Sequence, residues 1–363
     1  MTVTPSGPEL RTLTAARPAT NMVPPSPEQR RQLAEASVRT QFETVAAAAR
    51  GCDVIVAATA LQIAARSVAE TMGIPYVFAA YCPAVLPSPH HAPPPIPPLP
   101  GQPAPMPETL DNRELWTRDG ERFNALFGAV LNAQRAALGL APVDDVRGHV
   151  FGEQPWLAAD PTLGPWPDPA DGAVIQTGAW ILHDDRALAR ELEAFLDAGE
   201  PPVYFGFGSI RATSDLSKVM IETARALGRR AIVLRGWADL SLIDDVPDCL
   251  AIGEVNQRAL FRRVAAVVHH GGAGTTTAAA LAGAPQVVIP QMYDQHYWAR
   301  RVQELGIGTA HAADAPSTDS LTSALERALR SDAPNRARSI ATVVRSDGAL
   351  IAARRLTVTI DAG

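Results

Sequence analysis

Residues 265–277 read Ala265-Ala266-Val267-Val268-His269-His270-Gly271-Gly272-Ala273-Gly274-Thr275-Thr276-Thr277. An apolar run is followed at once by closely spaced glycines, and then by threonines that open a helical pattern. This order predicts a strand, a glycine-rich turn and a helix N-terminus, whose free N–H groups and dipole point into one small space. A phosphate or pyrophosphate is the natural occupant of such a space. No Gly-Lys-Ser/Thr sequence follows, so the P-loop pattern is excluded.

The two histidines of this stretch are expected to have different roles. Adjacent residues of a strand point to opposite faces, so His269 and His270 diverge. We expect His269 to be buried and hydrogen-bonded, and His270 to donate to the anion, as a cation when it is protonated. No third ligand is in view, so a shared metal site is not expected. A purely structural alternative is a glycine-rich turn that lets helix and sheet pack closely.

The strand–helix rhythm continues on both sides of this stretch, which predicts a parallel sheet covered by helices on both faces. Helices are predicted from Ser214 or Asp215 to Gly228, from near Thr275 to Gly283, and from near Asp294. The expected strands of the second half are Val203 to Phe207, Ala231 to Leu234, Leu250 to Ile252, Ala265 to His269, and Gln286 to Ile289.

The first half of the chain shows the same alternation. A capping box at Ser26 and Gln29 predicts the first helix, which Gly51 ends. The long loop Pro83 to Pro107 is too rich in proline for a helix or a central strand. The other predicted elements are strands Asp53 to Ala58, Pro75 to Ala80 and, as the last of this half, Trp156 to Ala159, and helices Ala60 to Met72 and Asn112 to Leu138 with Gly120 as a weak point.

Three further groups of residues lie where ligands bind in such folds, at the carboxyl edge of the sheet. The loop Gly206-Phe207-Gly208-Ser209 is a second candidate anion loop or a plain turn. Asp294 and Gln295 could hydrogen-bond sugar hydroxyls, and Asp294 could equally cap a helix. Trp237 could support a flat base, although a tryptophan more often belongs to the core.

The composition limits the classes of function. The chain has 363 residues, a length that suits two domains, and 47% of them are hydrophobic, enough for buried cores. Its net charge of −6 gives no electrostatic reason to bind nucleic acid or an anionic membrane. Three scattered cysteines, Cys52, Cys82 and Cys249, suit a reducing compartment. Met1 to Thr20 has no signal-peptide core, and the apolar stretch Val54 to Ala65 is too short to span a bilayer. We therefore expect a soluble, cytoplasmic protein, and a monomer.

Taken in order, several segments resemble the donor domain of the family 1 GT-B glycosyltransferases, and most of all the actinomycete group that glycosylates vancomycin-type glycopeptides. In the second half they are Leu234-Arg235-Gly236-Trp237, Ile252-Gly253-Glu254-Val255-Asn256, Leu260 to Val267, His269 to Thr275, Ala284-Pro285-Gln286, Pro290-Gln291-Met292 and Asp294-Gln295. In the first half they are Arg66 to Glu70, Cys82-Pro83, Pro87 to His90, and, further on, Gln176 to Leu182.

The resemblance implies a GT-B fold of two facing Rossmann-like, doubly wound domains. It implies an acceptor domain at residues 1–165, a linker at 166–185, and a donor domain at 186–363 whose C-terminal helix crosses back. It also implies transfer of a hexose from a nucleoside-diphosphate sugar, with inversion and without a metal or other cofactor, to a hydroxyl of a glycopeptide aglycone or pseudoaglycone.

The resemblance also implies residue roles. His270, Gly272, Gly274 and Thr275 would hold the pyrophosphate, and Asp294 and Gln295 the sugar. Trp237 and Val255 would lie beside the base and ribose, and Ser209 belongs to the second anion loop. Such an arrangement would stabilise the negative charge that builds up on the departing nucleoside diphosphate.

Members of this family begin with a strand and a glycine-rich loop that carries the expected catalytic aspartate. Nothing between Met1 and Pro25 resembles that segment, so the acceptor domain is expected to be incomplete and the catalytic base is unassigned. His90 and His91 are not expected to replace it, because a proline-rich loop holds a base poorly. A late start codon, a degraded paralogue and a non-catalytic nucleotide-sugar-binding accessory protein stay open. A GT-B epimerase would need more acidic residues around the sugar than Asp294.

Overall fold

The computed structural model describes residues 3–5, 26–94, 110–170, 172–208, 215–236, 240–312, 315–330 and 332–361. The chain forms two compact units. Unit 1 consists of Met1–Ala158, Trp166–Gly178 and Ala349–Gly363, and unit 2 of Ala159–Pro165 and Ala179–Gly348. The two units therefore alternate along residues 158–179, a stretch that overlaps the expected linker at 166–185 only in part.

Unit 2 is built on a six-stranded parallel sheet in the order β10-β9-β8-β5-β6-β7. The strands are β5 (Val203–Gly206), β6 (Ala231–Leu234), β7 (Cys249–Ile252), β8 (Ala266–His269), β9 (Gln286–Val288) and β10 (Gly308–Ala310). The five strands expected in this half are present. β10 was not predicted, because three residues with one buried side chain give no apolar run.

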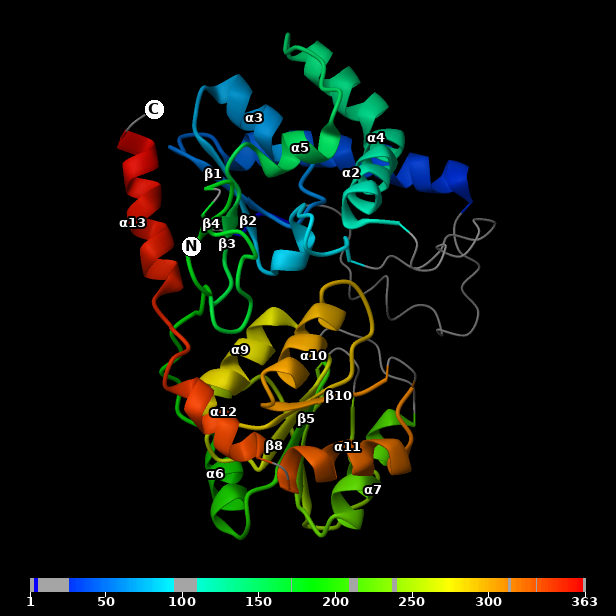
Figure 1. Ribbon diagram of the computed structural model, residues 1–363, viewed down its shortest axis with the longest axis vertical. Coiled ribbons are helices and arrows are strands. Elements are labelled where there is room, and N and C mark those ends of the chain that lie inside the picture. Colours follow the sequence, from blue (N-terminus) through cyan, green and yellow to red (C-terminus); the bar gives the residue numbers. More distant parts are fainter. Residues whose placement is uncertain are drawn as a thin grey trace. The chain divides into compact units, whose positions relative to one another are not determined.

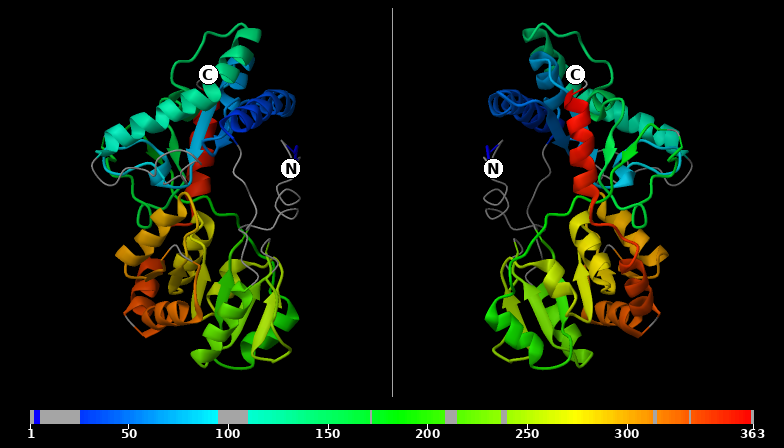
Figure 2. Two further views of the ribbon diagram at one scale, coloured as in Figure 1. Left: turned by 90° about the vertical axis from the view of Figure 1, so that its right-hand side faces the viewer. Right: turned by 90° about the vertical axis from the view of Figure 1, so that its left-hand side faces the viewer.

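Helices cover both faces of this sheet, as Figures 1 and 2 show. They are α6 (Arg190–Asp197), α7 (Leu216–Ala226), α8 (Gln257–Phe261), α9 (Ala273–Ala282), α10 (Gln295–Glu304), α11 (Thr318–Arg330) and α12 (Ala333–Ala341). Alternate residues of β5 point to opposite faces of the sheet and belong to two hydrophobic cores. Val203 and Phe205 pack with α7 and α11, whereas Tyr204 packs with α6, α8 and α9. The predicted α/β class is therefore confirmed.

Unit 1 contains a second parallel sheet in the order β1-β2-β3-β4. The strands are β1 (Ile55–Ala58), β2 (Tyr76–Ala80), β3 (Trp156–Leu157) and β4 (Ile175–Gln176). The prediction that β3 is the last strand was wrong. β4 pairs with β3 through Trp156 and Ile175, and its two residues are too few to show a pattern.

The helices of unit 1 are α2 (Pro27–Ala48), α3 (Ala65–Met72), α4 (Asn112–Ala137), α5 (Val146–Phe151) and α13 (Gly348–Asp361), with a short 3-10 turn at Pro83–Val85. The capping box of α2 forms as predicted: Ser26 Oγ accepts from the Gln29 N–H, and Gln29 Oε1 accepts from the Ser26 N–H. α13, the red helix in Figure 1, belongs to unit 1 from Ala349 onward.

Two helix predictions in unit 1 need correction. α3 begins at Ala65 instead of Ala60, because Gln41 of α2 binds the Leu61 carbonyl and the Ala64 N–H and so holds the preceding turn open. Gly120 is no weak point, since α4 runs through it without a break. A Cβ at Gly120 would come within 3.4 Å of the Arg147 guanidinium, so glycine admits that side chain.

α5 was not predicted. Among the described residues, no helix is long and apolar enough to cross a membrane.

Candidate functional site

The carboxyl ends of β5 and β8 meet at the point where the strand order of unit 2 reverses. From β5 the chain continues to β6 and β7 on one side, and from β8 to β9 and β10 on the other. Ligands of open α/β sheets bind at such a point. The loops contact each other there: Gly208 has a φ of +59°, and a Cβ on it would lie 3.1 Å from Cε1 of His270.

The N-terminus of α9 opens at this switch point. Gly272 occupies the N-cap position and no side chain caps it. Thr276 and Thr277 turn their hydroxyls back to the carbonyls of Gly272 and Ala273, at 2.9 and 2.8 Å. Thr275, the first threonine of the run, has a hydroxyl and an amide that form no hydrogen bond with the described residues. Such a helix start can hold an anion.

His269 is the structural histidine that the sequence predicts. It is fully buried; its Nε2 bonds Gln286 Oε1 at 2.9 Å, and its Nδ1 accepts from the Gly271 N–H at 3.1 Å. This pattern makes Nε2 the protonated nitrogen of a neutral ring. Burial lowers the pKa of His269 to about 3. The residue fixes the turn and is unsuited to proton transfer.

His270 lies against the glycines on either side of the turn. A Cβ on Gly272 would come within 2.6 Å of His270 Nε2. Any residue other than glycine at position 272 would therefore displace the imidazole ring. Burial lowers the pKa of His270, and the backbone of Gly206 acts in the opposite direction. A neutral imidazole therefore stands next to the open end of α9, where an incoming anion would favour its protonated form.

Gly271 joins this turn to α10. It has a φ of +92°, and a Cβ there would lie 2.7 Å from Val288 Cγ1 and 3.0 Å from the Gln295 carbonyl oxygen. The backbone of α10 can approach the turn only because position 271 lacks a side chain. Nothing in the local sequence predicts separate roles for Gly271 and Gly208, but their positive φ values explain why both are glycines.

Asp294 and Gln295 stand at the start of α10. Gln295 is buried, and its Oε1 accepts from the N–H groups of Gln291 and Met292 at 2.7 and 3.1 Å. Its Nε2 forms no hydrogen bond with the described residues, so a ligand could use it. Asp294 is the N-cap residue of α10, as one of the two interpretations predicted, but its side chain makes no capping hydrogen bond. Burial raises its pKa.

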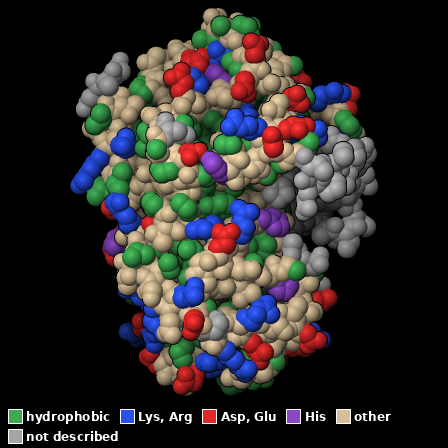
Figure 3. Space-filling view, in the orientation of Figure 1, with side chains coloured by type: hydrophobic (Ala, Val, Ile, Leu, Met, Phe, Trp, Pro, Cys, Tyr) green, Lys and Arg blue, Asp and Glu red, His purple; other side chains and the backbone are tan. Residues whose placement is uncertain are grey.

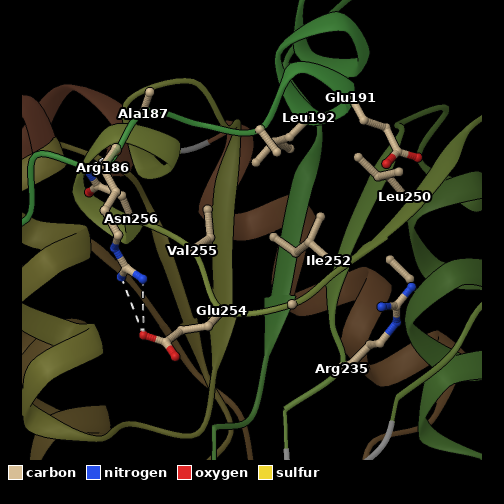
Figure 4. Close-up of a pocket in the computed structure, with 13 residues that line it drawn as sticks. Arg186, Ala187, Glu191, Leu192, Arg235, Leu250, Ile252, Glu254, Val255 and Asn256 are labelled. Carbon is tan, nitrogen blue, oxygen red and sulfur yellow. Dashed lines mark hydrogen bonds and ion pairs between the residues drawn. The ribbon is translucent and has the colours of Figure 1, made fainter.

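Val255 follows β7 and lines a separate cavity of about 360 Å³ at the edge of the sheet, shown in Figure 4. Arg235, Ile252 and Glu254 line it as well. The two remaining candidates, Ser209 and Trp237, lie outside the described residues.

The His90 and His91 side chains have different surroundings in unit 1. His91 Nε2 bonds the Leu86 carbonyl at 2.9 Å, and the Trp116 indole donates to the His91 carbonyl at 2.8 Å. His90 Nε2 lies 2.7 Å from Asp168 Oδ2, and both side chains are about half exposed. The loop around both residues is thus better anchored than its proline content suggests.

Within the described ranges, no group of three or more His, Cys, Asp or Glu side chains could hold a metal ion. On the face drawn in Figure 3, basic and acidic side chains are interspersed. The hydrogen-bond donors at the start of α9 are backbone amides, the Thr275 hydroxyl and the His270 imidazole. Donors of this kind suit an anion of modest size.

Comparisons with known proteins relate the chain to a family of enzymes. Residues 219–349 match the family described as "Erythromycin biosynthesis protein CIII-like, C-terminal domain". The chain is 51% identical to the glycosyltransferase GtfE of Amycolatopsis orientalis, over 95% of this chain and 84% of that protein. It is 49% identical to the vancomycin aglycone glucosyltransferase of the same organism, over 97% of this chain and 84% of that protein.

A solved structure, the glycotransferase of kitacinnamycin, matches with a TM-score of 0.70 at 20% identity, over 96% of this chain and 88% of that one. The fold is therefore GT-B. The chain belongs to the family 1 GT-B glycosyltransferases, in the group that contains the Amycolatopsis glycopeptide enzymes. It is a glycosyltransferase; no comparison favours an epimerase or a non-catalytic binder.

Proposed function

We propose that this protein transfers a hexose from a nucleoside-diphosphate sugar to a hydroxyl of a vancomycin-type glycopeptide aglycone or pseudoaglycone, in antibiotic biosynthesis. The observation that carries the donor part is the uncapped start of α9 beside His270. The acceptor class rests on the identity of about half of all residues with a vancomycin aglycone glucosyltransferase.

In this proposal the diphosphate binds the amides of Gly274 and Thr275, the Thr275 hydroxyl and the His270 ring. When the acceptor hydroxyl attacks the anomeric carbon, its oxygen forms the glycosidic bond and its proton is released to water. The bond to the diphosphate breaks, and its electron pair leaves with the phosphate oxygen. The helix dipole and His270 then stabilise the charge that has built up. No metal is required, because these donors replace one.

Asp294 and Gln295 are proposed to bind the sugar. The free Nε2 of Gln295 can donate to a hydroxyl, while its Oε1 stays fixed by two backbone amides. Fixing the oxygen fixes the whole amide plane, so the direction of the donor is set before the sugar arrives. Val255 and Trp237 are proposed to lie beside the ribose and base.

The proposed reaction is tested by incubating the purified chain with a glycopeptide aglycone and either a UDP-hexose or a dTDP-hexose. We expect the aglycone to gain the mass of one hexose with one of the two donors. Donor binding without any mass gain would instead support the non-catalytic accessory protein. Failure to bind either donor would contradict the donor site itself.

A further inference from the structure

The cavity beside Val255 has an outer wall that comes from a distant part of the chain. Arg186, Ala187 and Ala189 line the cavity together with the end of β7 and the residues that follow it. Figure 4 shows Arg186 reaching toward Glu254. We call residues 184–187 the wall segment. It belongs to unit 2 and has neither helix nor strand structure.

Asn256 holds the wall segment in place. Its Nδ2 donates to the carbonyls of Asp184 and Arg186, at 2.8 and 3.0 Å, and its Oδ1 accepts from the Ala259 N–H at 3.1 Å. Only the nitrogen can serve two carbonyls and only the oxygen can accept from an N–H, so the amide orientation is unambiguous. Asn256 is 7% exposed, which makes these bonds costly to lose.

The other contacts of the wall segment are weaker. Arg186 pairs with Asp184 at 2.8 Å and reaches Glu254 at 3.4 Å, but its side chain is 60% exposed and that of Glu254 is 86% exposed. Exposed pairs of this kind contribute little. Among the described residues, no backbone–backbone hydrogen bond holds 184–187. Leu188, the next residue, packs against the core of unit 2 and anchors the C-terminal end of the segment. Within residues 184–187 themselves, the position of the wall depends on the Asn256 amide.

We infer that Asn256 is a positioning residue for the donor: it keeps the wall segment against the cavity beside Val255, so that the nucleoside part of the donor binds into a preformed pocket. The inference rests on the proposed function, because it assigns the cavity to the nucleoside. Its physical basis is the entropic cost of ordering a loop when a ligand binds. If the loop is already ordered in the free protein, binding does not carry this cost and the affinity is higher.

Asn256→Asp separates the two roles of the amide. A carboxylate still accepts from the Ala259 N–H and caps α8, but it cannot donate to the two carbonyls. Asn256→Ser is a second variant, since a serine also caps a helix but is too short to bridge. The matched control is Asn132→Asp in α4, where an Asn amide also clamps a loop, through the Val143 carbonyl and N–H.

Two readouts are measured: the Kd of UDP and of dTDP by calorimetry, and the rate of tryptic cleavage after Arg186 by mass spectrometry. We expect Asn256→Asp and Asn256→Ser to raise the Kd about tenfold and to speed this cleavage. We expect nucleotide to slow cleavage in the wild type. Asn132→Asp should alter neither readout.

The inference is overturned if both Asn256 variants bind nucleotide within about twofold of the wild type, or if cleavage after Arg186 is unchanged in them. A wild type that binds neither nucleotide overturns the proposed function and this inference together. Wild-type binding with equal binding by the variants overturns only the inference.

Discussion

Gly272 and His270 pack so closely that a Cβ on Gly272 would stand 2.6 Å from Nε2 of the imidazole. The ring therefore occupies space that any other residue at position 272 would fill. Because the same glycine is the N-cap of α9, one position sets both the helix start and the place of the ring beside it. The proposed donor site depends on this pair.

Gly272→Ala should displace the His270 ring and weaken nucleoside-diphosphate binding about tenfold or more, while the fold survives. The control is Gly128→Ala in α4, where an added Cβ meets only Val146 Cγ2 at an ordinary 3.9 Å. Calorimetric titration with UDP and dTDP compares the two. Equal weakening by both variants would show that the effect is not local to the turn.

Nucleotide binding should take up a proton at His270. Burial lowers its pKa in the free protein, and a bound diphosphate favours the charged ring. We expect calorimetry at about pH 7.5, above the second phosphate ionisation, to show proton uptake in buffers of different ionisation enthalpy. His270→Gln should abolish the uptake and weaken binding. Uptake of the same size in that variant would assign the proton elsewhere.

Acid should destabilise the protein through His269. An unfolded histidine has a pKa of about 6.5, whereas burial lowers the folded pKa of His269 to about 3. The unfolded chain thus binds the extra proton first, and stability is lost as the pH falls from about 6.5 toward the folded pKa. Between about pH 6 and pH 4, urea unfolding of wild type should lose about 1.4 kcal/mol per pH unit more than His269→Gln. Parallel pH profiles would refute this.

Arg135 should stabilise unit 1 without affecting the donor. Its buried guanidinium donates to Ser67 Oγ at 2.8 Å, to Glu70 at 2.7 Å and to the Ala141 carbonyl at 2.7 Å, so it joins α3 to α4. Arg135→Met should cost about 2–3 kcal/mol, less than a fully buried pair because Glu70 is partly exposed. Thermal unfolding is compared with Arg118→Met, an exposed pair with Glu114. A similar loss in both would contradict the prediction.

Much of unit 2 could be predicted from local sequence. The apolar runs of β5, β6, β8 and β9 are long enough to show, and the glycines after His270 indicate a strand-to-helix turn. β4 and β10 escaped prediction because Ile175-Gln176 and Gly308-Thr309-Ala310 form no apolar run. The role of Asn256 depends on a contact with Asp184, 72 residues away, which no local pattern contains. Its position just before α8 was the one available signal, because asparagine is a good N-cap.

For the threonines after Gly274, residue types alone suggest more hydrogen-bond donors than the structure provides. The sequence offers three hydroxyls to an anion, yet two of them bond back to the carbonyls of Gly272 and Ala273. Threonine in a helix often makes such a bond to a residue four positions earlier. Only the first threonine of the run is left for a ligand, and residue types alone do not reveal which one.

The central claim is that the start of α9 and His270 hold the diphosphate of the donor. The most direct test is a crystal structure of the protein with UDP or dTDP bound. We predict that the diphosphate lies within hydrogen-bonding distance of the Gly274 and Thr275 amides and of the His270 ring. A diphosphate bound elsewhere, with this turn empty, would contradict the account.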